Sequence, residues 1–403
     1  MEQQRLVITG VGVVAPNGIG KEEFWNNCFA GVSGIKPITL FDTSTYRCHY
    51  AGEVSNFQPE QYLGSKGLRN LDRTTLLALV AAKLAIDDAK LEITDENRND
   101  IGVVLGSTMG SVHSISEFDK EGLREGPRYV NPAQFPNTVI NSPASQVAIR
   151  FGLRGLNATI STGFTASLDA IGYAMDMLRL GRVRALLVGG VEELCIQTFL
   201  GFYKLGFLAT AQNGTPPVFA PFDVRRCGAL LGEGAAFFVL EPLEQATERK
   251  AMICAELLGY ATQFSSASMY RYDPEGQGLK EVLRQVLEES GVDPDEVDYV
   301  SASANSTKAG DAAESVALQS VLGHAQATPI HAVKSMLGES FSASGALQVA
   351  AAIGTLIEQR MPPTSSWQQS ESFAQAARLE RVLVSGFGPM GVASALALGR
   401  VRD

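Results

Sequence analysis

Apolar residues follow two patterns along the chain. Short, unbroken runs rich in Val, Ile and Leu alternate with longer stretches in which apolar residues recur at helical spacing. The short runs predict buried strands and the longer stretches predict helices. The expected strands are residues 5–14, 101–106, 185–190, 235–240, 253–261, 298–302, 330–333, 382–385 and 392–398. The expected helices are residues 21–30, 72–89, 137–151, 279–290, 310–322 and 344–357. This alternation predicts an α/β layered fold.

Residues 156–174 carry the most distinctive local pattern. They predict a short buried strand at 159–161, a tight turn at Thr162-Gly163-Phe164 and a helix from Thr165 onward. A turn of this kind places one residue at a helix N-terminus, where free N–H groups and partial positive charge gather. Enzymes hold nucleophiles at such elbows, since a thiolate is stabilised there. Here the elbow residue is Phe164, which has no nucleophilic atom.

Two other segments lack a regular pattern. Residues 31–59 are rich in turn signals and predict loops, and residues 110–132 predict an irregular polar excursion.

The two halves of the chain repeat one plan. In the first half RVRALLVGGVEE precedes AAFFVLEP, and in the second ERVLVSGFGP precedes GVASALALG. Each pair is an apolar strand ending in glycines followed by a second apolar strand. We therefore expect a duplicated unit, residues 1–250 and 251–403, with two sheets sandwiched between helices.

Composition narrows the functional classes. The 403 residues carry a formal net charge of −10, which argues against nucleic acid and anionic membranes as partners. No run of 18 apolar residues and no signal-peptide pattern is present. Five scattered cysteines without a CxxC pair fit reduced thiols and a cytoplasmic location. We expect no metal, because His49, His113, His324 and His331 are far apart in sequence, and no cofactor, because nucleotide-binding glycine motifs are absent.

Several segments, in this order and spacing, resemble the β-ketoacyl-acyl carrier protein synthases of the thiolase superfamily. They are VITGVGVVAPNG (7–18), FDTSTY (41–46), the elbow (156–174), APFDVRRCGALLGEGAAFFVLE (220–241), ANSTKAGDAAE (304–314), VKSMLG (333–338) and VSGFGPMG (384–391). The resemblance spans nearly the whole chain. It implies a five-layer α-β-α-β-α fold built from two similar halves and working as a dimer.

In that family a Cys at the elbow holds the acyl chain as a thioester, and two His polarise the malonyl thioester during decarboxylative condensation. The elbow position falls on Phe164. The first His position, where members usually read HGTGTxxGD, falls on Ser303, and the second, after the KSMxG turn, falls on Glu339. The resemblance therefore implies that all three catalytic residues are replaced.

Four residues around these positions match the family: Asp311, Glu314, Lys334 and Phe387. In active relatives the Lys and Glu hold the histidines, and the Phe gates the thioester. Here we expect the Lys and Glu to persist as a structural ion pair and Phe387 as a packing residue.

A full-length scaffold without its catalytic set resembles the chain length factor, the ketosynthase-like partner subunit of type II polyketide synthases. This implies a subunit that is non-catalytic on its own, pairs with an active ketosynthase and meets acyl carrier protein mainly through that partner. The usual elbow residue of that subgroup is Gln. Phe164 departs from it and lacks the amide to which a role in malonyl decarboxylation has been given.

The family segment that crosses the dimer interface and lines the partner's tunnel aligns with residues 132–138. The resulting tunnel candidates are Gln134, Phe135, Asn137, Thr138 and Asn141. Plain interface packing is the alternative. Residues 196–207 either cap the same tunnel or form an ordinary core helix.

Two other functional readings stay open. One is a condensing enzyme or acyltransferase with a rearranged site at Ser303, Glu339 or Cys227, while Cys195 is a further thiol. The other is a scaffold without influence on the tunnel.

Overall fold

The computed structural model describes residues 4–210, 219–266, 271–323, 328–363 and 378–401. Within these residues, ten strands form one hydrogen-bonded path in the order β11-β10-β12-β13-β9-β1-β8-β7-β5-β6. The strands of the first half are β1 (Leu6–Ala15), β5 (Ile101–Gly106), β6 (Asn157–Ile160), β7 (Ala185–Glu192) and β8 (Gly234–Pro242). Those of the second half are β9 (Ala255–Phe264), β10 (Tyr299–Ser301), β11 (Ile330–His331), β12 (Arg381–Phe387) and β13 (Val392–Gly399).

The order of this sheet is the same when read inward from either end. Numbered within its own half, each set of five strands runs third, second, fourth, fifth, first. In each set the fifth strand is antiparallel to its two neighbours. The other two pairs, third with second and second with fourth, are parallel. The expected two sheets are joined, because Leu6–Ile8 of β1 pair with Ala255–Leu257 of β9.

Helices cover both sets of strands. They are α1 (Lys21–Phe29), α2 (Glu60–Leu63), α3 (Arg73–Ala89), α4 (Val112–Glu125), η1 (Pro132–Thr138), α5 (Ser142–Phe151), α6 (Ala166–Arg179), α7 (Ile196–Lys204), α8 (Leu243–Glu248), α9 (Gln277–Ser290), η2 (Pro294–Glu296), α10 (Lys308–Leu322), α11 (Lys334–Leu337) and α12 (Ser342–Glu358). Three short strands complete the set: β2 (Gly18–Ile19), β3 (Ile35–Pro37) and β4 (Tyr50–Gly52).

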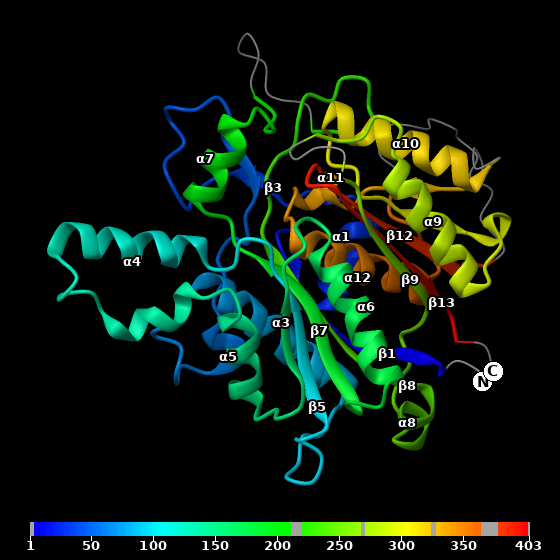
Figure 1. Cartoon of the computed structure of the whole chain (residues 1–403), viewed down its shortest axis with the longest axis horizontal. Helices are drawn as coiled ribbons and strands as arrows, with labels where there is room; N and C mark the ends of the chain where they lie inside the picture. The colour runs from blue at the N-terminus through cyan, green and yellow to red at the C-terminus, as the bar shows by residue number, and fades with distance from the viewer. Residues whose placement is uncertain (1–3, 211–218, 267–270, 324–327, 364–377, 402–403) are drawn as a thin grey trace.

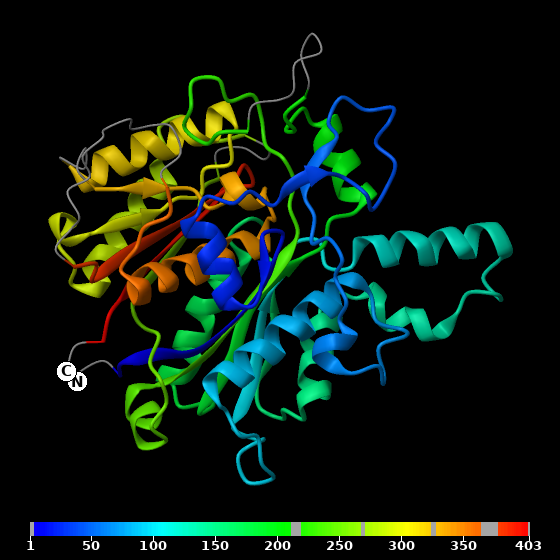
Figure 2. The same ribbon diagram turned by 180° about the vertical axis from the view of Figure 1, so that it is seen from behind.

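Three hydrophobic cores give the molecule its five layers. The central core packs α6 and α12 between the two sets of strands (Figure 1). A second core joins the other face of the first set to α3 and α5, and a third joins the other face of the second set to α9 and α10. Seen from behind, the outer helices of the two halves lie on opposite sides of the body (Figure 2). The expected α-β-α-β-α fold is confirmed.

Three local predictions were wrong. Residues 110–132, expected to be irregular, contain the 14-residue helix α4. The single helix expected over 137–151 is instead the 3-10 helix η1 followed by α5. The strand before the elbow, expected to be buried, is β6, a half-buried strand at one end of the sheet. Within the described residues, no helix is both long enough and apolar enough to cross a bilayer.

Candidate functional site

Phe164 occupies the turn between β6 and α6. Gly163 adopts a φ of 86°, which suits glycine and lets the chain reverse into the helix. The Phe164 side chain is buried, with 3% of its surface exposed. Its ring meets Phe341 edge-on at a centroid distance of 5.1 Å, and the rings of Phe202 and Phe207 lie 6.1 Å and 6.0 Å away. The elbow is thus filled by an aromatic cluster.

A buried carboxylate fixes the same elbow to the second half of the chain. Asp169, in the first turn of α6, accepts hydrogen bonds from Thr162 and Thr165 of the elbow. It also accepts from the hydroxyl of Tyr260 at 2.6 Å and from Ser394 at 2.5 Å, on β9 and β13. The backbone around Phe164 is therefore held by both halves.

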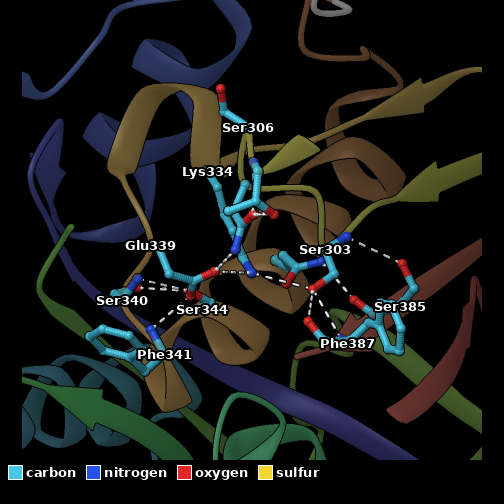
Figure 3. Close-up of polar contacts among 12 residues, drawn as sticks. Ser303, Ser306, Lys334, Glu339, Ser340, Phe341, Ser344, Ser385 and Phe387 are labelled. Carbon is cyan, nitrogen blue, oxygen red and sulfur yellow. Dashed lines mark hydrogen bonds and ion pairs between the residues drawn. The ribbon is translucent and has the colours of Figure 1, made fainter. Parts of the chain in front are cut away.

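Glu339, which the resemblance places at the second His position, is fully buried, and both of its carboxylate oxygens accept hydrogen bonds. One carboxylate oxygen accepts from the Lys334 ammonium and from the Asn305 amide, both at 2.8 Å. The other accepts from the Phe341 N–H and the Ser344 hydroxyl, both at 2.9 Å. Figure 3 shows the carboxylate facing Lys334. A carboxylate neutralised in this way cannot act as the neutral imidazole that the condensation requires.

Ser303, which the resemblance places at the first His position, links this ion pair to Phe387 at the end of β12. Its hydroxyl accepts from the Phe387 N–H at 3.1 Å and lies 3.2 Å from the Phe387 carbonyl oxygen (Figure 3). The Lys334 ammonium lies 3.3 Å from the same hydroxyl. Phe387 is therefore held through its backbone, and its ring packs against Tyr272 at 5.2 Å.

The expected Lys–Glu ion pair forms with a different partner. Lys334 pairs with Glu339, whereas Glu314 accepts from the Ser303 N–H at 2.8 Å and from the Ser385 hydroxyl at 2.6 Å. Burial raises the pKa of Glu314 to about 7, because the charged carboxylate loses its hydration. Lys334 therefore pairs with Glu339, and Glu314 is held by Ser303 and Ser385 instead.

Asp311 organises the backbone beside the site. It accepts from the N–H groups of Phe222, Asn305 and Ser306, and lies 3.6 Å from the Arg226 guanidinium. Burial raises its pKa to about 6. Asp311 fixes the loop that carries Asn305, whose amide in turn donates to Glu339, so Asp311 is linked to the Lys334–Glu339 pair through Asn305.

A cavity of about 360 Å³ opens above the aromatic cluster. Its floor and walls are largely apolar, and Thr307 and Tyr272 add polar groups. The residues that line it are Phe164, Phe202, Leu205, Gly206, Phe207, Cys227, Gly228, Tyr272, Thr307, Lys308, Ala309, Pro389 and Met390. Residues 196–207, including α7, therefore lie against this chain's own elbow.

Among the cysteines that the structure describes, Cys227 is half-buried, and it lines this cavity. The other four thiols are buried. Burial raises the pKa of Cys48 and Cys195 to about 11, and that of Cys28 and Cys254 to about 12. Such thiols react poorly at neutral pH, because the thiolate is the nucleophile.

The tunnel candidates lie on η1 and the turn after it, beside α4. Phe135 is 58% exposed and packs against Phe118 of α4 at 6.2 Å. Gln134, Thr138 and Asn141 are partly or fully exposed. Asn137 is buried, and its amide donates to the Asn70 carbonyl at 2.7 Å. Asn137 is therefore held by its own chain, whereas Phe135 and Asn141 are exposed and Gln134 and Thr138 are half-buried.

Other candidate groups play no part in this cluster. Among the described residues, no group of three or more His, Cys, Asp or Glu side chains is arranged to hold a metal ion. His331 is buried on β11, where burial lowers its pKa to about 4, and His324 lies outside the described residues.

Three site residues escaped the sequence analysis: Asn305, Tyr272 and Phe341. Asn305 lies inside the ANSTKAGDAAE segment, and its position in that motif is the signal that could have identified it. Phe341 lies two residues beyond Glu339 and has a φ of 47°, which no sequence pattern reveals.

Comparison with known proteins agrees with the fold and the motifs. The β-ketoacyl synthase N-terminal domain model matches residues 3–246, and the C-terminal domain model matches residues 254–368. A 3-oxoacyl-acyl-carrier-protein synthase 2 from Coxiella burnetii is 34% identical over the full length of both chains. The ishigamide ketosynthase/chain length factor structure is 32% identical, with a TM-score of 0.88 over 99% of this chain and 100% of that one.

A second solved structure is a type II polyketide synthase acyl-carrier protein in complex with its ketosynthase bound to the hexaketide. It is 28% identical, with a TM-score of 0.87 over 99% of this chain and 100% of that one. By its two matching domains, its motifs and its duplicated sheet, this chain belongs to the β-ketoacyl synthase family of the thiolase superfamily.

Proposed function

We propose that this chain is a chain length factor: a ketosynthase-like subunit, non-catalytic on its own, that pairs with an active ketosynthase in type II polyketide synthesis. The observation that carries the proposal is the combined state of the three catalytic positions. Phe164 has no lone pair to attack a thioester, Ser303 has no basic nitrogen, and Glu339 is neutralised by Lys334. Each position also has a stable new packing or hydrogen-bonding role.

The replacements would also oppose the condensation chemistry electrostatically. Loss of CO2 from a malonyl thioester leaves an enolate, which needs donors or positive charge beside it. Lys334 is the cation hydrogen-bonded to Ser303 and Glu339, and it is already paired with Glu339. The name of the Coxiella burnetii relative is that of a condensing enzyme, so the proposal rests on these residues and not on overall similarity.

The surface around α4, η1 and α5 supports pairing with another ketosynthase-fold chain. Strand β6 ends the sheet and leaves one backbone edge without a strand partner among the described residues. Ile149 lies on α5, which packs against β6, and is 72% exposed, while Leu123 and Tyr129, on α4 and in the turn after it, are 87% and 73% exposed. In both ribbon views α4 and η1 project from the body as an arm (Figures 1 and 2). An unpaired edge beside exposed apolar residues is typical of an interface.

The tunnel role extends this proposal. Phe135 and Asn141 are exposed on the arm and Gln134 and Thr138 are half-buried there, so that a partner chain docked on the arm would cover them. We propose that their bulk limits the space available to the growing chain in the partner's tunnel. Residues 1–250 and 251–403 are proposed as the two duplicated halves, with the arm in the first.

Co-expression with the Cys-containing ketosynthase of the same biosynthetic locus tests the proposal. We expect a stable one-to-one heterodimer by size-exclusion chromatography with light scattering. Ile149→Glu should weaken it, whereas Met252→Glu, at a 69% exposed residue between α8 and β9, should not. A homodimer that does not bind the ketosynthase, or condensing activity of the isolated chain, would contradict the proposal.

One observation favours the rival function of a rearranged acyltransferase. Cys227 lines the same cavity as Phe164, so a thiol is present where an acyl group would arrive. It lies in the segment before β8 and does not occupy the turn before α6, where the family's nucleophile would stand. Intact-mass analysis of the isolated chain after incubation with an acyl thioester distinguishes the two functions.

A further inference from the structure

The first turn of α4, at the base of the arm, is held by an acidic side chain from another element. His113 is the second residue of the helix, and its N–H group has no acceptor one turn earlier within α4. It donates instead to the carboxyl of Glu193, in the segment that follows β7, at 3.1 Å. Ser111 occupies the N-cap, but its side chain forms no capping hydrogen bond. Glu193 therefore takes the place of a cap for this helix.

Two further carboxyl groups lie beside Glu193. Asp72, at the N-cap of α3, accepts from the Thr75 N–H at 2.8 Å, and its second oxygen is buried without a hydrogen-bond partner among the described residues. Thr74, next to Asp72, lies within hydrogen-bonding reach of the Glu193 carboxyl. Glu192 is completely buried and accepts, in the described chain, only from backbone N–H groups and hydroxyl groups.

The guanidinium that faces these groups is already engaged. Arg73 binds Glu233 through two hydrogen bonds, of 2.7 Å and 2.6 Å. In the described chain this is the one ion pair formed by any of the carboxyl groups around it, which are those of Glu53, Asp72, Glu192, Glu193 and Glu233. The other titratable groups near Glu193 are the Cys195 thiol and the exposed His113 ring, whose Nδ1 lies 3.2 Å from Oε1 of Gln197.

This shortage of positive charge decides the protonation of Glu193. Ionising all the unpaired carboxyl groups together would gather like charges in a largely buried region, which is unfavourable. Burial, followed by the charge of Asp72, raises the pKa of Glu193 to about 8. The His113 N–H and the positive end of α4 favour the ionised form, but burial outweighs them. In the folded chain, Glu193 therefore holds a proton at neutral pH.

We propose that Glu193 carries a proton while the first turn of α4 is docked on the body, and that loss of this proton releases the turn. The carboxyl O–H bond breaks, its electron pair stays on the oxygen, and a base in the solvent takes the proton. The helix α4 is the element that yields, because none of its residues is buried, whereas α3 and β7 lie in a hydrophobic core. The inference concerns one chain and does not depend on the proposed function.

The direction of the pH dependence follows from the two states. Release of the turn admits water to Glu193, so its pKa returns toward the ordinary value of about 4.3. Between that value and about 8 the docked turn binds more protons than the released turn. Docking is therefore favoured at the acid end. It weakens by up to about tenfold per pH unit as pH rises, and the change levels off above about 8.

Hydrogen exchange of the His113 amide in the full-length chain tests the inference. It is followed from about pH 5.5 to about pH 9 by mass spectrometry with residue-level fragmentation, and is corrected for the intrinsic exchange rate. We expect protection of this amide to fall at least about tenfold over the range and then to level off. Protection that stays constant or increases with pH would overturn the inference.

Glu193→Gln separates the proton from the hydrogen bond. The Gln side chain keeps an oxygen that accepts from the His113 N–H but does not titrate, so protection should be the same across the pH range. The matched control is Glu125→Gln, at an exposed residue in the last turn of the same helix, which should behave like the unaltered chain. A loss of protection with rising pH in Glu193→Gln, equal to that of the control, would overturn the inference.

Asp72→Asn tests the neighbouring charge without removing Glu193. Asn keeps the N-cap acceptor for the Thr75 N–H, so α3 retains its cap. Without the charge of Asp72, the loss of protection at His113 should level off about one pH unit lower, because Glu193 then ionises more readily. A levelling-off point that stays in place would also overturn the inference, since the charge beside Glu193 would then have no effect.

Discussion

The ammonium group of Lys334 lies 2.8 Å from the carboxylate of Glu339, and both side chains are at least 98% buried. The two residues are five positions apart, on either side of a turn at Gly338, whose φ is 83°. A Cβ added at Gly338 would meet the Leu231 carbonyl oxygen at 2.4 Å. Glycine therefore lets the chain turn so that the carboxylate faces back to the lysine.

Removing the lysine should destabilise the protein strongly. Lys334→Met leaves Glu339 as a buried charge without a counterion, which we expect to lower the free energy of unfolding by about 3–5 kcal/mol. Adding Glu339→Gln should recover part of this loss, because the buried charge is then gone. Urea denaturation of the two single variants and the double variant measures the coupling. Purely additive losses would show that the pair does not act as a unit.

The stability of the protein should depend on the protonation of Glu314. Its pKa of about 7 in the folded state lies above the value of about 4.3 expected for an unfolded chain. Between these values the folded state binds more protons, so stability is greatest at the acid end and falls as pH rises through 7.

Glu314→Gln should flatten this slope by up to about 1.4 kcal/mol per pH unit. Denaturation curves collected from pH 4.5 to pH 8 measure it, with Glu288→Gln on the exposed face of α9 as the control. An unchanged slope in Glu314→Gln would show that this carboxyl titrates in the same way in the folded and unfolded chains.

Truncating the elbow residue should cost stability without creating activity. Phe164→Ala removes a ring that three other Phe rings contact, and we expect a loss of about 3 kcal/mol. Phe264→Ala, at a residue that is 66% exposed, is the matched control and should lose far less. Equal losses in thermal or urea denaturation would mean that the cluster around Phe164 contributes little.

Changing bulk on the arm should change product length in the heterodimer. Phe135→Ala should lengthen the polyketide and Thr138→Phe should shorten it, as measured by mass spectrometry of the products. Asn137→Ala should instead lower stability by about 1–3 kcal/mol, because the Asn70 carbonyl loses its buried donor. Unchanged product length in both arm variants would favour a scaffold role.

Much of the fold followed from the apolar pattern, because the main strands are buried along nearly their whole length and the core helices bury one continuous face. The helix α3 was predicted to within one residue, and Asp72 caps it through the Thr75 N–H. The helix α4 was missed because none of its residues is buried against the chain itself, so its polar surface resembles a loop. The joining of the two sheets was not predicted, because it depends on three residue pairs between β1 and β9, which do not change the pattern of apolar residues in the sequence.

The site was only partly predictable. The motifs indicated that Phe164, Ser303 and Glu339 occupy related positions, because family order and spacing carry that information. The choice of Glu339 over Glu314 as the partner of Lys334 depends on the backbone turn at Gly338.

Whether an acyl group can bond to this chain tests the central claim most directly. The purified heterodimer is incubated with acyl-loaded carrier protein, and the intact mass of each subunit is measured. We expect an acyl adduct on the partner's elbow cysteine and none on this chain. An acyl adduct on this chain, at Cys227 or at any other residue, would contradict the claim that its site is chemically inert.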